Sequence, residues 1–169
     1  MQNFIIKLTQ KNINLLENKD VGCYIISSEM TDNMIKQAVE KVHSLNKLIL
    51  VSGDNAEDLY QKYQTDGFIL DCSTANSPAK IVKAARKNAP QAIIGVISRN
   101  RRHEAMLISE CEPDFIIFRL WYEGLEKNLE LLQWYSDLFL IQCAALPEEE
   151  IPLKNISADF IILSDIATK

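Results

Sequence analysis

The stretch AIIGVISRNRRHEAMLISECEPDFIIFRL, residues 92–120, decides the fold of this chain. It contains two apolar runs, residues 92–98 and 114–120, which are rich in Ile and show little polar alternation. Such runs are typical of parallel strands that are buried on both faces. The segment between them places Ala105, Met106 and Ile108 on one helical stripe. The stretch therefore predicts a strand–helix–strand unit.

The same unit repeats along the chain. Apolar stripes with helical spacing run from Met34 to Leu45 and from Leu125 to Leu132. Helix starts are expected after Asn55, after Asn76 or Ser77, and after Ser98 or Asn100. The other β-type runs are GCYIIS (22–27), KLILVSG (47–53), GFILDCS (67–73), LFLIQCA (138–144) and DFIILSD (159–165). The sequence thus predicts an α/β protein built from consecutive βα units.

The sheet could be an open, doubly wound sheet or a closed barrel. NFIIKLT, residues 3–9, supplies an eighth strand, and eight strands favour a compact TIM-type (β/α)8 barrel. The connections at 11–20 and 147–157 are short, and little chain follows residue 165. We therefore expect reduced or missing helices in the first, seventh and last units. The 169 residues are predicted to form one domain, residues 1–169.

The charge and composition of the chain argue against some classes of binding partner. The net charge is −5 and the basic residues are spread along the chain, so neither nucleic acid nor a membrane surface is expected as a partner. We predict a cytoplasmic protein, because no stretch is as apolar and as long as a membrane span. The four cysteines show no C-x-x-C spacing. Three of them, Cys23, Cys72 and Cys143, lie in or beside β-type runs, where we expect buried thiols and not disulfides or zinc ligands.

Candidate functional residues are those that follow the β-type runs, because chemistry in such folds sits at the carboxyl ends of the strands. Arg99 and Asn100 precede a predicted helix, where they form either an anion site or a solvated basic turn. Arg119 could bind a phosphate or carboxylate, or it could pair internally with Asp71 or Asp165. We favour internal pairing, because a half-buried arginine must find an anion with or without a ligand.

In order and spacing, these strands resemble the thiamine-phosphate synthase/TenI family, in a compact and divergent form. Residues 92–120 resemble that family's IIGVS-x-H-N strand and helix and its ADYVGFGP strand. Residues 48–71 look like its LIINDR…ADGVHLG segment, and residues 125–165 resemble its last two strands. The resemblance implies a transferase that couples a hydroxymethylpyrimidine diphosphate to a thiazole phosphate, with Mg²⁺ as a cofactor.

Most of that family's functional groups are replaced in this sequence. The two cations expected at the second strand are absent from residues 24–29, and Arg119 stands where the family has glycine. We therefore predict weak or absent synthase activity and assign no catalytic residue. The resemblance leaves Asn100, Arg99, Arg119 and Ser164 as candidates for substrate or phosphate binding, and Asp54 and Asp71 as candidate metal ligands.

The expected ligand is a phosphorylated heteroaromatic small molecule. The alternative is a noncatalytic barrel that binds a small molecule or another protein. In that case the aromatic side chains around Trp121 or Trp134 would form the contact surface. Aromatics at helix ends also commonly pack between helix and strand, so both roles stay open for them. A homodimer is a further expectation, because the last unit leaves a face of the barrel uncovered.

Overall fold

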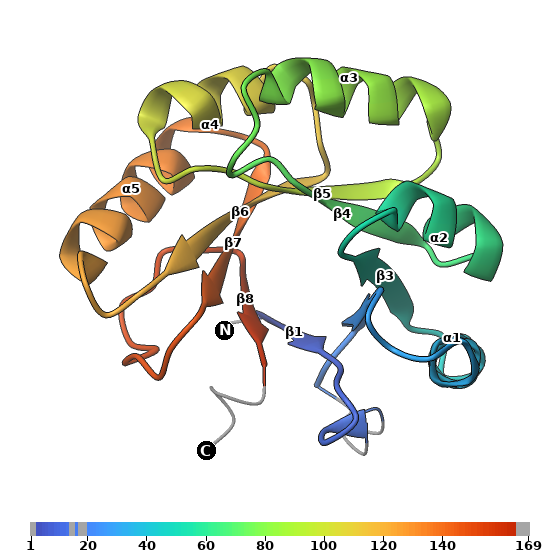
Figure 1. Ribbon diagram of the computed structural model, residues 1–169. Helices are drawn as coiled ribbons and strands as arrows, with labels where there is room; N and C mark the ends of the chain where they lie inside the picture. The colour runs from blue at the N-terminus through green and yellow to red at the C-terminus, as the bar shows by residue number, and fades with distance from the viewer. Residues whose placement is uncertain (1–2, 14–15, 17–19, 165–169) are drawn as a thin grey trace.

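The computed structural model describes residues 3–13, 16 and 20–164, and these form a closed barrel of eight parallel strands in sequential order (Figure 1). The barrel closes where β1 pairs with β8, with Ile5 opposite Ile162. The strands are β1 (Asn3–Lys7), β2 (Cys23–Ser27), β3 (Leu48–Ser52), β4 (Gly67–Asp71), β5 (Ile93–Ile97), β6 (Phe115–Leu120), β7 (Gln142–Pro147) and β8 (Phe160–Leu163). The predicted (β/α)8 barrel is confirmed, and the open sheet is excluded.

Within the residues that the structure describes, five α-helices lie outside the strands. They are α1 (Asp32–Ser44), α2 (Ala56–Tyr63), α3 (Pro78–Asn88), α4 (Arg102–Ser109) and α5 (Leu125–Leu138). In Figure 1 they form an arc outside β2 to β7. The described residues between β1 and β2, and those between β7 and β8, contain no α-helix, as predicted for the first and seventh units. Residues 165–169, where the last helix was expected to be reduced, lie outside the described part of the chain.

The apolar runs are continuous because each strand is buried on both faces. On β2, Ile25 points into the barrel, whereas Tyr24 and Ile26 pack under the helices. The barrel interior is filled mainly by aliphatic side chains: Ile5, Ile25, Leu50, Ile69, Ile97, Ile117 and Ile162, together with Phe115 and Ala144. Strand residues alternate in direction, so one run contributes to two cores.

The helical stripes are confirmed in part. In α4, Ala105 and Ile108 are buried as predicted, but Met106 is exposed and does not belong to the packed face. In α1 the buried positions are Ile35, Ala38, Val39 and Val42, so the face that packs on the sheet lies beside the predicted stripe. Thr31 caps this helix by accepting a hydrogen bond from the backbone N–H of Met34 at 3.4 Å. No helix in the described part of the chain is both long and apolar enough to cross a membrane.

Two predicted boundaries are wrong. The run LFLIQCA was placed in a strand beginning at Leu138, but α5 continues to Leu138 and β7 begins only at Gln142. The ring of Phe139 stacks on Tyr135 of α5 at 4.5 Å, and Leu140 is fully exposed. The first four residues of this run therefore form the helix end and a bend, and only the last three belong to β7. The helix expected after Ser98 or Asn100 begins at Arg102, with Arg101 in the capping position.

Candidate functional site at the carboxyl mouth of the barrel

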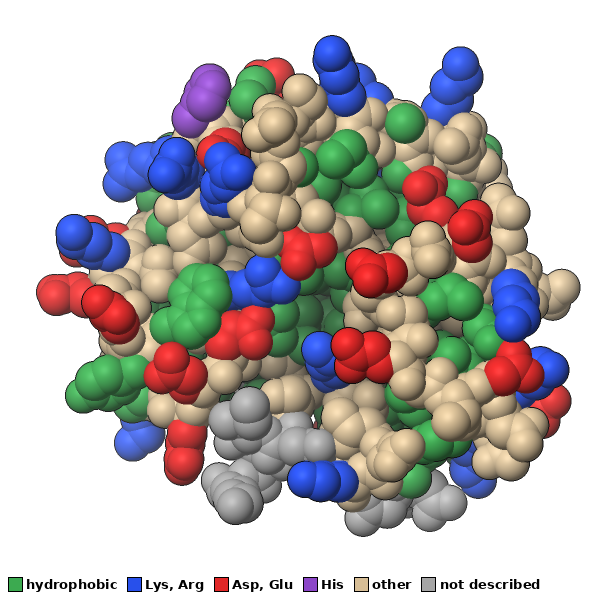
Figure 2. Space-filling model, in the orientation of Figure 1, with side chains coloured by type: hydrophobic (Ala, Val, Ile, Leu, Met, Phe, Trp, Pro, Cys, Tyr) green, Lys and Arg blue, Asp and Glu red, His purple; other side chains and the backbone are tan. Residues whose placement is uncertain are grey.

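A cavity of about 270 Å³ opens at the carboxyl ends of the strands. Its apolar lining comes from the barrel interior: Ile25, Ile69, Ile97, Ile117, Leu146 and Ile162. Its polar rim consists of Lys7, Ser27, Glu29, Ser52, Gly53, Asp71, Arg119 and Glu148. Figure 2 shows a hollow near the centre of the molecule, with hydrophobic side chains inside it and acidic and basic side chains around it. We call this cavity the mouth.

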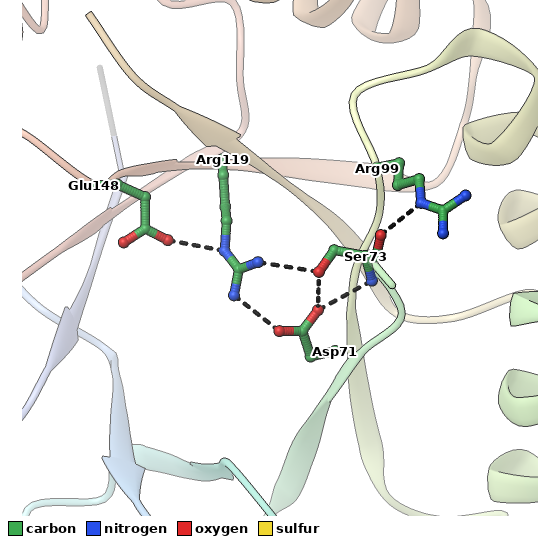
Figure 3. Close-up of polar contacts among 5 residues, drawn as sticks. All are labelled: Asp71, Ser73, Arg99, Arg119 and Glu148. Carbon is green, nitrogen blue, oxygen red and sulfur yellow. Dashed lines mark hydrogen bonds and ion pairs between the residues drawn. The ribbon is translucent and has the colours of Figure 1, made fainter. Parts of the chain in front are cut away.

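Arg119 extends from β6 across one side of the mouth (Figure 3). Its Nη2 donates to Asp71 Oδ2 at 2.8 Å, and its Nη1 donates to Ser73 Oγ at 3.1 Å. Its Nε lies 2.8 Å from Glu148 Oε1, an ion-pair contact that is not aligned as a hydrogen bond. The predicted internal pairing with Asp71 is confirmed, and the alternative partner, Asp165, lies outside the described residues.

Asp71 is held in its charged form. Burial raises the pKa of this carboxyl, but hydrogen bonds from Ser73 and Arg119 outweigh that effect and leave the pKa below its ordinary value. Oδ1 accepts from the Ser73 hydroxyl at 2.6 Å and from the Ser73 backbone N–H at 3.0 Å. Three donors therefore already satisfy the side chain that the sequence offered as a metal ligand.

Asp54 lies apart from the mouth, just before α2. It lines a second, open hollow together with Asp71. Among residues 3–13, 16 and 20–164, no three His, Cys, Asp or Glu side chains come together in an arrangement that could hold a metal ion. The Mg²⁺ expectation stays a prediction.

Arg99 and Asn100 come together with Arg119, although much of their hydrogen-bonding capacity is used within the protein. Arg99 Nε donates to the Ser73 carbonyl at 2.6 Å, and Nη1 lies 3.3 Å from Glu104 Oε1. Asn100 Nδ2 donates to the Arg119 carbonyl at 2.7 Å and to Asn128 Oδ1 at 2.9 Å. These contacts connect the loop after β5 to β6 and α5, so Asn100 helps to position Arg119.

Ser164, the remaining phosphate-binding candidate, directly follows β8 and is half-buried. It is not one of the residues that line the mouth. The predicted phosphate position at the last strand therefore lies beside the cavity, while Ile162 two residues earlier points into it.

The sequence arguments missed Lys7 and Glu148. Lys7 ends β1 and lines the mouth, and the rule that placed the other candidates at strand ends would have identified it. Glu148 belongs to the run Glu148–Glu150, which follows β7 directly. Its proximity to Arg119 depends on how β6 and β7 align, and the composition of a short acidic run carries no information about that alignment.

The four cysteines do not contribute a nucleophile to the site. Cys72, Cys111 and Cys143 are buried, and Cys23 is half-buried at the opposite end of the barrel. Burial raises the pKa of Cys23 to about 12 and that of Cys143 to about 11, so both stay protonated thiols at neutral pH. The prediction of buried thiols is confirmed for Cys72 and Cys143, whereas Cys23 is only half-buried.

Comparison with known proteins supports the resemblance in part. No protein-family model matches the chain. It is 34% identical over 86 residues to thiamine-phosphate synthase from Erythrobacter litoralis, covering 44% of this chain and 40% of that protein. It is 28% identical over 121 residues to thiamine-phosphate synthase from Hyphomonas neptunium, covering 66% of this chain and 53% of that protein. The matched region thus spans about half, or less, of the length of these curated relatives.

Solved structures support the fold. 3-Keto-L-gulonate-6-phosphate decarboxylase from Vibrio cholerae superposes with a TM-score of 0.68 at 12% identity, covering 96% of this chain and 88% of that chain. KGPDC from Streptococcus mutans gives 0.66 at 14% identity, covering 97% and 88%. Homocysteine methyltransferase from Escherichia coli gives 0.65 at 10% identity, covering 96% and 90%. At these identities the likeness concerns the barrel and not the chemistry.

Proposed function

We propose that this protein is a thiamine-phosphate synthase-like barrel that binds one small molecule at its mouth and does not couple the two thiamine precursors. The observation that carries this proposal is the position of Arg119. Its guanidinium is held between Asp71 and Glu148, at 2.8 Å from each carboxylate. An arginine bound in this way is not available to bind a substrate phosphate.

The balance of charges at the mouth also supports the absence of synthase activity. The synthase reaction releases pyrophosphate, and cations must neutralise the negative charge that grows in its transition state. The mouth holds two cations, Lys7 and Arg119, and three carboxylates, Glu29, Asp71 and Glu148. Each missing charge-assisted contact would forgo about 1.5–3 kcal/mol of transition-state stabilisation.

The size of the cavity also favours a single ligand. Sites for one drug-sized molecule typically enclose roughly 300–1,000 Å³. The mouth, at about 270 Å³, lies just below that range. A pyrimidine diphosphate and a thiazole phosphate together would need considerably more enclosed space. The volume therefore supports binding of one small ligand on the aliphatic lining.

The direct test is a synthase assay with both precursors and Mg²⁺, read out as thiamine phosphate by chromatography. We expect no product above the level without enzyme, whereas the Erythrobacter litoralis synthase in the same mixture serves as the active control. A parallel thermal-shift measurement with each precursor alone reports binding, because a ligand that binds the folded state raises Tm. Production of thiamine phosphate at a rate comparable to that of the control would refute the proposal.

A second candidate function is protein interaction through the loop before α5. Tyr122 is 73% exposed and Trp121 is 39% exposed, so two aromatic side chains face solvent together. Trp134 does not join them, because it packs against Tyr135 and Phe139 and lies under Arg102. If this surface makes a homodimer, light scattering after gel filtration will give twice the 19.3 kDa monomer mass, and the double change Trp121→Ser with Tyr122→Ser will restore the monomer. A monomer at all concentrations excludes the homodimer.

A further inference from the structure

Lys7 is the cation at the mouth that forms no ion pair with a described side chain. It ends β1, between β8 and β2, and its half-buried side chain lines the cavity. Within the described part of the chain, no hydrogen bond or ion pair joins its ammonium to another side chain. Arg119, by contrast, is held by two carboxylates and a hydroxyl. An ammonium beside an aliphatic lining without an anionic partner is an anchoring group for an anion.

The surrounding charges limit which anion can bind. Arg119, Asp71 and Glu148 form a group with one net negative charge, and Glu29 adds another at the rim. A phosphate ester carries nearly two charges at neutral pH and would be repelled by these carboxylates as well as attracted by Lys7. A carboxylate carries one charge, which the single ammonium of Lys7 balances.

The apolar lining of the mouth favours an apolar body for the rest of the ligand. Below the polar rim, the side chains of Ile25, Ile69, Ile117 and Ile162 present an aliphatic surface. An apolar ligand body would bury its surface there at about 25 cal/mol per Å². The carboxylate would then remain at the level of Lys7, which stands at the strand end.

We propose that the mouth binds a small organic monocarboxylate with an apolar body, and that Lys7 binds its carboxylate. This inference rests on the proposed function, because it names the class of the single ligand that the mouth takes. It concerns a residue, Lys7, that neither the resemblance nor the arguments from strand ends assigned. The enclosed volume of about 270 Å³ limits the ligand to about the size of one substituted ring.

Three matched probes test the inference by ¹H–¹⁵N correlation spectra of the full chain at pH 7 and constant ionic strength. Benzoate and benzamide have the same shape and differ in charge, and phenyl phosphate carries the same ring with a dianionic group. We expect benzoate to shift the backbone amides of Ser27 and Ser52, which line the mouth. Benzamide should bind about ten-fold more weakly, the loss expected for one charge-assisted contact.

The matched variants are Lys7→Met and Lys80→Met. Lys80 lies exposed on α3, away from the mouth, so its replacement should leave benzoate binding unchanged. Lys7→Met should reduce benzoate affinity about ten-fold, to the level of benzamide. If Lys7→Met does not fold, Lys7→Gln and Lys7→Arg separate loss of charge from loss of packing, because only arginine keeps the cation.

The outcomes separate the inference from the proposed function. Equal affinity of the wild-type protein for benzoate and benzamide, or tighter binding of phenyl phosphate, overturns the monocarboxylate assignment. Unchanged benzoate binding in Lys7→Met overturns the role of Lys7. In all three cases the mouth still binds a small molecule, so the proposed function stands. If none of the probes and neither thiamine precursor shifts any mouth amide, both the inference and the proposed function fail.

Discussion

Arg119 links three segments that are distant in the sequence. It joins β6 to Asp71, the last residue of β4, to Ser73 just after that strand, and to Glu148 after β7. Its side chain is 25% exposed, so the ion pairs are only partly screened by water. The arginine should therefore contribute to the stability of the folded barrel.

Replacement of Arg119 by Met should destabilise the protein by about 1–2 kcal/mol, because two carboxylates would lose their counter-charge. Urea denaturation followed by circular dichroism measures this change. Arg101→Met is the control, since that guanidinium is 72% exposed and lies 3.9 Å from Glu104. We expect the control to cost less than about 0.5 kcal/mol. Equal effects of the two substitutions would show that the Arg119 ion pairs contribute no net stability.

Asp71 should make part of the stability dependent on pH. The folded state lowers the pKa of the Asp71 carboxyl. The contribution of this carboxylate to folding stability is therefore complete above the unfolded pKa of about 3.9, and it is lost as the pH falls through the folded pKa. Asp71→Asn should therefore be less stable than wild type at pH 7, by about 1 kcal/mol or less because the carboxylate is half exposed. The difference should shrink at pH 3.

Urea denaturation at both pH values gives this difference. Glu130→Gln, on the exposed side of α5, provides a comparison outside the mouth. A stability difference for Asp71→Asn that is the same at pH 7 and pH 3 would contradict the assigned cause, since packing effects do not titrate.

At the scale of single elements, β4 and β5 approach each other closely because β4 begins with glycine. A Cβ at Gly67 would lie 1.9 Å from the Ile93 carbonyl oxygen, a contact that no side-chain movement can relieve. The pairing of Gly67 with Ile93 starts the β4–β5 ladder, so this position sets the spacing of the two strands.

Gly67→Ala should consequently lower the free energy of unfolding by about 1–3 kcal/mol or more, the range found for overpacking in a core. Gly22→Ala is the matched control, because no atom lies within 4 Å of the Cβ it would add. Thermal and urea denaturation of both variants will show the difference. Wild-type stability in Gly67→Ala would mean that β4 and β5 can separate without loss.

For the whole molecule, closure of the barrel protects the thiols. Three of the four cysteines are buried, and burial raises the pKa of the fourth, Cys23, to about 12. A thiol reagent at pH 8 should react slowly with the folded protein and with all four thiols after denaturation, because the thiolate is the reactive form. Absorbance of the released chromophore gives the count. Rapid reaction of more than one thiol in the folded protein would indicate that the barrel opens.

The order of the elements could be predicted from the sequence, whereas several boundaries could not. Strand runs such as GFILDCS are apolar throughout because both of their faces are buried, and that signal is local. The run LFLIQCA carries the same signal but mostly forms the end of α5 and a turn. Tertiary contacts distinguish the two runs. Phe139 stacks on Tyr135 of α5, and the hydrogen-bonded ladder between β7 and β6 begins only at Gln142.

The α/β class, the order of the strands along the chain and the end of the barrel at which polar side chains collect all follow from the sequence. The local sequence pattern is enough to predict these features, because a strand that is buried on both faces is apolar at nearly every position. Which charged side chains come into contact depends on the closed barrel. Arg119 and Asp71 are 48 positions apart, and Lys7 faces the same mouth from the other end of the chain. Closure of β1 onto β8 brings these side chains together, because it makes the first and last strands neighbours.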